Sequence, residues 1–108
     1  MESQRIMLDV RRLGIGRRYR GYKSVIKAIR MVLMDEDRLL CLKSGVYQPL
    51  SEEEQRDWRA IERNLRTIIH RAWCVNPEYL SKLAGFPLDR APTVTEFVDR
   101  LTAHAQKW

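Results

Sequence analysis

The side chains best suited to ligand chemistry in this sequence are arginines that recur along one predicted helix. The stretch 57–73, DWRAIERNLRTIIHRAW, places polar side chains at positions i, i+4, i+7 and i+11, which share one side of a helix: Arg59, Arg63, Arg66 and His70. Glu62 lies at the edge of this row. A guanidinium presents a flat fork of donors that matches phosphate oxygens and guanine edges. An ordinary solvated helix surface would carry the same pattern, so the row alone leaves both interpretations open.

The helix that must position these arginines has an apolar side. Its members recur at the spacing of a helix docked on a core: Ile61, Leu65, Ile68, Ile69, Ala72 and Trp73. Ahead of it, Ser51 and Glu54 have capping-box spacing, which predicts a short helix beginning near Ser51. Asp57 suits the cap of the arginine helix. Local rules leave open whether 51–56 and 58–73 form two helices or one.

Positive charge is concentrated before that helix. The 108 residues carry 20 Lys/Arg and 14 Asp/Glu, a net charge of +6, and residues 1–50 account for all of it, with 11 basic and 5 acidic side chains. The segment 11–30 contains no acidic residue. A local field of this kind favours polyanions, either nucleic acid or an acidic protein surface.

Length and composition exclude several classes of protein. We expect one domain over residues 1–108, because the chain is long enough for one core only. No apolar run approaches the roughly 18 residues of a membrane span, and MESQRIMLD lacks the pattern of a secretory signal. Cys41 and Cys74 fall within apolar helical pattern, so we expect reduced core thiols in a cytoplasmic protein without metal or cofactor.

The remaining periodicity predicts an all-α fold, a compact bundle of about six helices. Ser3 can cap a first helix that Gly14 and Gly16 end, and a second helix spans about 22–34. An acidic turn at 35–37 follows, in which Asp37 can cap a short third helix that Gly45 ends or kinks.

Two further helices follow the arginine helix. Asn76 and Pro77 read as the cap and first residue of a short helix that Gly85 closes. Thr93 and Glu96 form a capping box at the start of the last helix, which directs an apolar stripe inward: Val94, Phe97, Val98, Leu101 and Ala105. No alternating strand pattern of useful length occurs.

Several short motifs in the order of the chain resemble one known family. They are Gly21-Tyr22, Ala28-Ile29 with Met31-Val32, Leu39-Leu40, Tyr47 near a proline, Ile61-Glu62-Arg63 with Arg66, Ala72-Trp73, and Pro92-Thr93 with Glu96-Phe97. Their order and spacing are similar to those of the C-terminal DNA-binding effector domain of the response regulator that initiates sporulation, stage zero sporulation protein A. The resemblance covers nearly the whole chain.

The resemblance implies a helix-turn-helix whose recognition helix is the segment around 57–73. In the family that helix enters the major groove and reads a short box, usually as tandem copies bound by paired domains. Glu62 and Arg63 stand where the family places base-contacting residues. Arg63 can fork onto guanine O6 and N7, and Glu62 can accept from a cytosine amine. A weak intrahelical pair of Glu62 with Arg66 is the alternative for Glu62.

Three departures from the family pattern bear on function. Ala60 replaces a base-reading arginine, and Arg59, one residue earlier, points about 100° away from that position. The run Glu52–Glu54 replaces lysines near the DNA backbone, where carboxylates would repel phosphates. The phosphoacceptor receiver domain that controls the family is not among these 108 residues, so we expect no control by aspartyl phosphorylation within them.

Two functions remain as hypotheses. The first is a DNA-binding transcriptional regulator in which Arg59, Glu62, Arg63 and Arg66 contact bases. Its phosphate contacts would be Arg17, Arg18, Arg20 and Lys23. It would bind double-stranded DNA as a homodimer or in tandem, with self-association through the last helix, residues 94–108.

The second hypothesis is an effector-like module that binds a protein partner, through Glu52–Glu54 and an exposed Trp58. We do not expect an enzyme. His70 and Cys74 have the i, i+4 spacing of two metal ligands, and His104 has no obvious partner, but no constellation of catalytic groups is visible.

Overall fold

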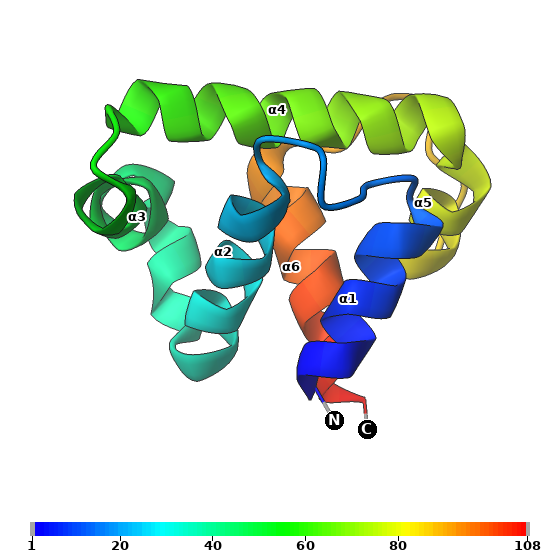
Figure 1. The fold of residues 1–108 in the computed structure, drawn as a ribbon. Coiled ribbons are helices and arrows are strands. Elements are labelled where there is room, and N and C mark those ends of the chain that lie inside the picture. The colour runs from blue at the N-terminus through cyan, green and yellow to red at the C-terminus, as the bar shows by residue number, and fades with distance from the viewer. Residues whose placement is uncertain (1, 108) are drawn as a thin grey trace.

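Six α-helices make up most of the chain in a computed structural model, which describes residues 2–107 and the side chains of 4–107 (Figure 1). No strand occurs within this described part, and the predicted all-α fold of about six helices is confirmed. A 3₁₀ turn (η1) and a π turn (η2) separate the second and third helices. The elements are α1 Glu2–Arg12, α2 Tyr22–Met34, η1 Glu36–Leu40, η2 Lys43–Tyr47, α3 Gln48–Glu54, α4 Trp58–Val75, α5 Pro77–Ala84 and α6 Val94–Gln106.

Helix α6 is the centre of the packing. It contacts α1, α2, α4 and α5, and it buries Val94, Phe97, Val98, Leu101 and Ala105, as the sequence predicts. Helix α4 lies across one end of the other helices, and both ends of the described chain lie at the opposite end (Figure 1). The apolar stripes of α1, α2 and α4 therefore meet around α6 in a single core.

The start of α3 differs from the prediction. We predicted a helix beginning near Ser51, but the chain runs from η2 directly into α3, so Ser51 lies inside a helix. The predicted short third helix is η1. Its cap is Asp35 rather than Asp37, since Asp35 Oδ1 accepts from the Asp37 amide at 3.2 Å. Gly45 does not end η1, which stops at Leu40, and lies instead inside η2. There Gly45 packs closely against Arg38, since a Cβ would lie 2.4 Å from the Arg38 carbonyl oxygen.

Two separate helices, α3 and α4, answer the question that local rules left open. Gln55 adopts a left-handed conformation (φ 53°) and ends α3. Asp57 is extended, and its carboxylate accepts from the Arg59 amide at 2.8 Å, which caps α4. A capped start therefore outweighs the helix propensity of the Gln55–Asp57 connection.

The caps of the last two helices are as predicted. Asn76 Oδ1 accepts from the Tyr79 amide at 3.1 Å, and Gly85 closes α5 with a φ of 86°. Thr93 and Glu96 form the capping box of α6, and the Thr93 amide holds the pKa of Glu96 below its usual value. Residue 108, which we placed in the last helix, lies outside the described residues. The predicted Ser3 cap is wrong, since α1 already includes Glu2 and Ser3 lies inside it.

Both cysteines are exposed, so the prediction of core thiols is wrong. Cys41 lies between η1 and η2, and Cys74 lies on the side of α4 that carries His70, 3.6 Å from its Nε2. A helix can contain an apolar stripe and still expose a thiol beside it. No helix within residues 2–107 has the length and hydropathy to cross a membrane.

A buried carboxylate joins three helices and was not visible in the sequence. Asp9 on α1 is 1% exposed. Its two oxygens lie 2.5 Å from the Tyr79 hydroxyl on α5 and 2.6 Å from Nδ1 of His104 on α6. Burial and the hydrogen bond to Asp9 raise the pKa of Tyr79. His104, for which the sequence suggested no partner, therefore helps to fix α1 against α6.

Replacement of Asp9 should destabilise the fold. Asp9→Ala leaves the Tyr79 hydroxyl and the His104 imidazole without their partner, and we expect a loss of about 2–3 kcal/mol in the free energy of unfolding. Urea denaturation followed by circular dichroism measures it. Asp99→Ala, which removes an exposed carboxylate from α6, should change stability by less than about 0.5 kcal/mol. Equal stability of the two variants would contradict a structural role for Asp9.

Candidate nucleic-acid interface

Helix α4 is held by one side only. The predicted stripe is buried at Ile61, Leu65, Ile68, Ile69 and Ala72, while Trp73 is half-buried. Since the rest of the domain lies below α4 in Figure 1, the opposite side of the helix is open along its length. The 18 residues of α4 span about 27 Å, which is enough to follow a groove of duplex DNA.

The predicted arginine row occupies that open side. Arg59, Arg63, Arg66 and His70 are all exposed. Arg59 lies 3.6 Å from Asp57, and Arg66 lies 3.4 Å from Glu62. Exposed pairs of this kind contribute about 0–1 kcal/mol, so either arginine can leave its partner at small cost. The guanidinium of Arg63 has no partner among the described residues and projects from the middle of the row.

An aromatic stack holds the first turn of α4. The rings of Tyr47 and Trp58 lie 6.2 Å apart and nearly parallel, with an interplanar angle of 14°. Lys43 and Arg59 place their cations over the Trp58 ring, at 4.8 and 5.0 Å. Trp58 is therefore half-buried and packs within the domain, so our prediction of an exposed Trp58 is wrong. Burial, followed by the nearby Glu62 carboxylate, raises the pKa of Tyr47 to about 12.

The basic loop between α1 and α2, residues 13–21, lies along one flank of α4 (Figure 1). Gly21 makes this approach close, since a Cβ there would lie 2.5 Å from Ile68 Cδ1 and 3.1 Å from the Asn64 carbonyl oxygen. Farther along, the Arg71 guanidinium lies 5.4 Å from the centre of the Tyr19 ring. The loop is therefore positioned by packing against α4 itself.

The four predicted phosphate contacts divide into separate places. Arg18 and Arg20 border the same hollow as Asn64 and Thr67, so they lie beside α4. Arg17 instead borders a groove with Leu8 and Tyr22, on the side of α1. Lys23 is exposed in the first turn of α2. Sequence spacing could not separate Arg17 from its neighbours, because the loop turns between them.

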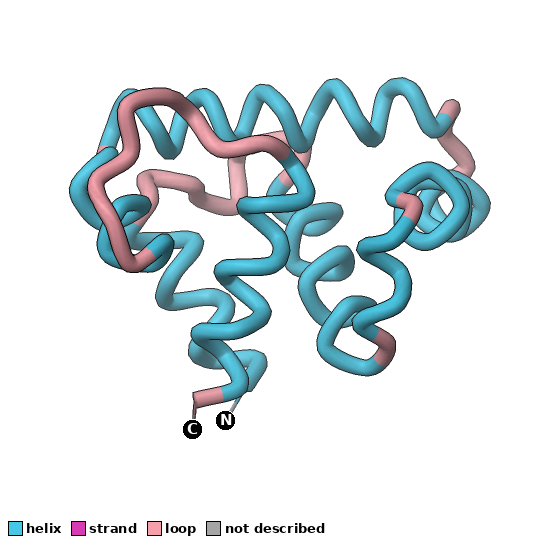
Figure 2. Tube along the Cα trace, turned by 180° about the vertical axis from the view of Figure 1, so that it is seen from behind, coloured by secondary structure: helices cyan, strands magenta, loops and turns pink. Residues whose placement is uncertain are grey.

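A second loop, 85–93, lies on the other flank of α4 (Figure 2). Its end meets the arginine row, since Pro92 and Thr93 border a hollow together with Arg66 and His70. Arg90 of this loop lies 3.5 Å from Glu96. The open side of α4 is thus framed by one loop on each flank.

The acidic run of α3 is partly engaged within the protein. The Ser24 hydroxyl on α2 donates to Glu54 at 2.8 Å, and Lys27 lies 2.8 Å from Glu53. Glu52 is exposed. Two of the three carboxylates that we expected to repel phosphates therefore bind α2, through contacts 26 and 30 residues apart in the chain that no local pattern indicates.

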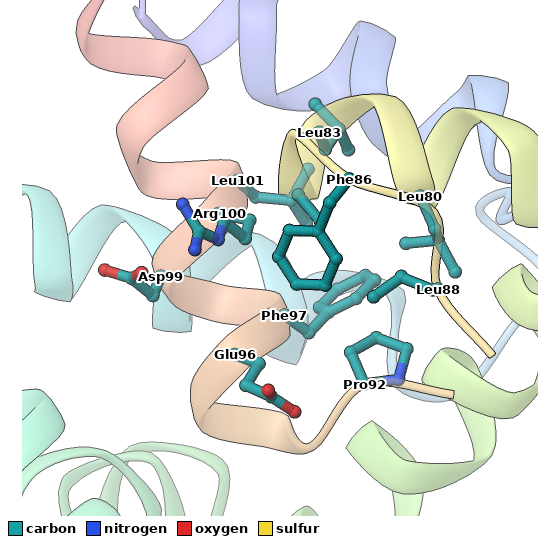
Figure 3. Close-up of a pocket in the computed structure, with 11 residues that line it drawn as sticks. Leu80, Leu83, Phe86, Leu88, Pro92, Glu96, Phe97, Asp99, Arg100 and Leu101 are labelled. Atoms are coloured by element: carbon teal, nitrogen blue, oxygen red, sulfur yellow. The ribbon is translucent and has the colours of Figure 1, made fainter. Parts of the chain in front are cut away.

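Among the described residues, two other candidate sites lack what their ligands need: one has too few groups for a metal, and the other is too small for an organic ligand. His70 and Cys74 are neighbours, but no group of three or more potential metal ligands occurs among the described residues. A cavity between α5, loop 85–93 and α6 is covered by Phe86 and lined mainly by apolar side chains, with Glu96, Asp99 and Arg100 at its rim (Figure 3). Its volume of about 80 Å³ is far below the roughly 300 Å³ of ligand pockets.

The comparison with known families agrees with this geometry. The family described as "Sporulation initiation factor Spo0A C terminal" matches residues 6–105, from within α1 to within α6. The chain belongs to this family. The family consists of DNA-binding effector domains of transcription regulators and not of enzymes. No individual curated protein matches the chain.

The burial of Tyr47 predicts a loss of stability at alkaline pH. An unfolded tyrosine releases its proton near pH 10, whereas folded Tyr47 keeps its proton up to about pH 12. The folded state therefore binds more protons above pH 10, and the free energy of unfolding should fall as pH rises from 10 towards 12. In Tyr47→Phe the slope of the free energy of unfolding against pH should be less negative, by an amount that corresponds to about one bound proton. Urea denaturation between pH 8 and 11.5 measures this slope. An unchanged dependence would contradict the burial of the hydroxyl.

Proposed function

We propose that this protein is a sequence-specific DNA-binding transcriptional regulator in which α3 and α4 form a helix-turn-helix. The observation that carries the proposal is the open, arginine-bearing side of α4, opposite a fully packed apolar side. Helix α4 would lie in the major groove, with α3 behind it. In this arrangement α4 is the recognition helix, and the three-residue connection Gln55–Asp57 is the turn.

The proposed base contacts are Arg59, Glu62, Arg63 and Arg66. Arg63 has the central role because its guanidinium is exposed and has no partner among the described residues, so it reaches guanine O6 and N7 without breaking any of the described contacts. Glu62 would accept from a cytosine amine once Arg66 leaves it for a phosphate or a base. Arg59 is less free, because its guanidinium lies over the Trp58 ring.

The proposed phosphate contacts are strongest for Arg18 and Arg20, which stand beside α4. Lys23 begins the helix that follows them, and Arg17 is the weakest of the four because it lies on the α1 side. Repulsion from α3 is smaller than its sequence suggests, since the positive charge of Lys27 offsets that of Glu53. Glu54 keeps its charge but is held towards α2 by the Ser24 hydroxyl. Action on DNA would place the protein in the compartment that holds DNA, in line with the predicted cytoplasmic location.

Binding of two copies, as a homodimer or in tandem, is part of the proposal. We predicted contact through the last helix. The apolar side of α6 is used within the domain, which leaves a mostly polar surface that includes Thr95, Asp99 and Arg100. Such a surface would supply a weak contact that becomes effective when two sites on one duplex hold the copies close together.

A module that binds only protein is the alternative function. It would use Glu52–Glu54 and Trp58, but Glu53 and Glu54 have partners on α2, and Trp58 is packed between Tyr47, Lys43 and Arg59. Titration of random duplex DNA at two salt concentrations separates the two functions. Binding that weakens steeply with salt supports the regulator, and no binding at low salt would favour the protein-binding module.

Two arginine variants should weaken DNA binding in different ways. Arg63→Ala should cost about 1–3 kcal/mol on the preferred sequence and relax the preference at one base pair. Arg18→Ala should weaken binding to all sequences alike and reduce the salt slope by about 1, because it removes a phosphate contact. Selection from a randomised duplex library and fluorescence anisotropy measure these effects.

Arg30→Ala is the matched control, since Arg30 is exposed on α2 and borders neither of the hollows that flank α4. It should leave both sequence preference and salt slope nearly unchanged. If Arg63→Ala and Arg30→Ala behaved alike on the preferred sequence, α4 would not be the reading helix.

A further inference from the structure

The largest exposed apolar side chains away from α4 and α5 gather on two surfaces of opposite charge. The first is the turn between α2 and η1, which we call the acidic knob. Met34 is 90% exposed and Leu40 is 85% exposed, and the acidic residues of the knob follow Met34 directly: Asp35, Glu36 and Asp37. The five residues of η1 span about 10 Å along its axis. Side chains this exposed bury almost nothing within their own chain.

The second surface is a groove between α1 and the start of α2, which we call the basic groove. It has a volume of about 350 Å³, and apolar and basic side chains line it together with Gln4: Met7, Leu8, Tyr22, Arg11 and Arg17. Met7 and Leu8 are 39% and 53% exposed. The guanidinium groups of Arg11 and Arg17 have no hydrogen-bond or ion-pair partner among the described residues. The groove therefore offers an apolar floor with two available positive charges.

The knob and the groove cannot meet within one molecule. Tyr22 is the first residue of α2 and Met34 is the last, so the rigid helix holds the two surfaces about 18 Å apart. A contact between them requires two molecules. Such a contact places the knob of one copy in the groove of another, either reciprocally in a two-fold dimer or head to tail along a row of copies.

We propose that the basic groove is a docking site for the acidic knob of a second copy of this chain. Met34 and Leu40 bury their side chains against Met7, Leu8 and Tyr22, while Glu36 and Asp37 face Arg11 and Arg17. Both components are complementary: two apolar side chains meet an apolar floor, and carboxylates meet guanidinium groups that have no partner within the described part of the chain. The position of Arg17 on the α1 side, away from α4, is explained by this contact. It does not depend on DNA binding.

Charge reversal tests the contact in the absence of DNA. The knob variant carries Glu36→Lys and Asp37→Lys, and the groove variant carries Arg11→Glu and Arg17→Glu. We expect wild type to self-associate with a Kd of about 100 µM or tighter, more weakly at high salt, in sedimentation equilibrium. Each variant alone should associate at least about tenfold more weakly, because like charges then face one another.

An equal mixture of the two variants is the decisive measurement. The lysine knob of the first variant fits the glutamate groove of the second, and the unchanged acidic knob of the second fits the unchanged basic groove of the first. Association should therefore return to about the wild-type strength. Unfolding is excluded as the cause of any loss, because a misfolded variant would not be rescued by mixing.

Phe86→Ser is the matched control, since Phe86 is 55% exposed and belongs to neither surface. It should leave association unchanged. The proposal is overturned if wild type remains monomeric at millimolar concentration, or if the mixture fails to associate. It is equally overturned if Asp99→Lys with Arg100→Glu on α6 abolishes association while the knob and groove variants retain it, since the contact then runs through α6.

Discussion

The burial of one side of α4 is the constraint on which the rest of the arrangement depends. Ile61, Leu65, Ile68 and Ala72 are at most 1% exposed, and a fully buried aliphatic side chain of the larger kind contributes about 1.5–3 kcal/mol. This burial fixes the rotation of α4 about its axis. Since an α-helix has a fixed period, the same rotation directs Arg59, Arg63, Arg66 and His70 away from the core without any further contact.

The loop between α1 and α2 adds a second constraint. Because Gly21 has no side chain, the loop backbone approaches α4 to a distance that a Cβ would prevent. This close contact places neighbouring arginines of the loop on different surfaces, although they look equivalent in the sequence. Arg18 and Arg20 stand beside Asn64 and Thr67, and Arg17 faces α1. One basic segment thereby supplies charge to two different surfaces.

Periodicity and capping motifs correctly predicted the features that depend on residues close together in the sequence. The two sides of α4, the Asn76 cap and the Thr93–Glu96 capping box could all be read from spacing within one or two turns. The start of α3 was wrong because Ser51 has the spacing of a cap while the preceding residues are already helical. A capping motif predicts a helix start only where the chain before it is not helical.

Contacts between distant parts of the chain could not be predicted. Asp9 and His104 are 95 residues apart, and the pairing of Glu53 and Glu54 with α2 depends on how α3 packs. The exposure of the two cysteines and the packing of Trp58 have the same origin. The family resemblance suggested the role that we propose for α4, but only the structure shows that Arg63 lacks a side-chain partner among the described residues.

The positions of the first and last helices have a consequence for the order of the chain. Helix α1 begins and α6 ends at the same end of the molecule, opposite α4 (Figure 1). A short linker could therefore join the two ends, and the chain could be reopened in the exposed segment at Asp89 and Arg90. Such a circular permutant would keep every helix and every contact around α4, which makes this architecture independent of the order in which its helices are synthesised.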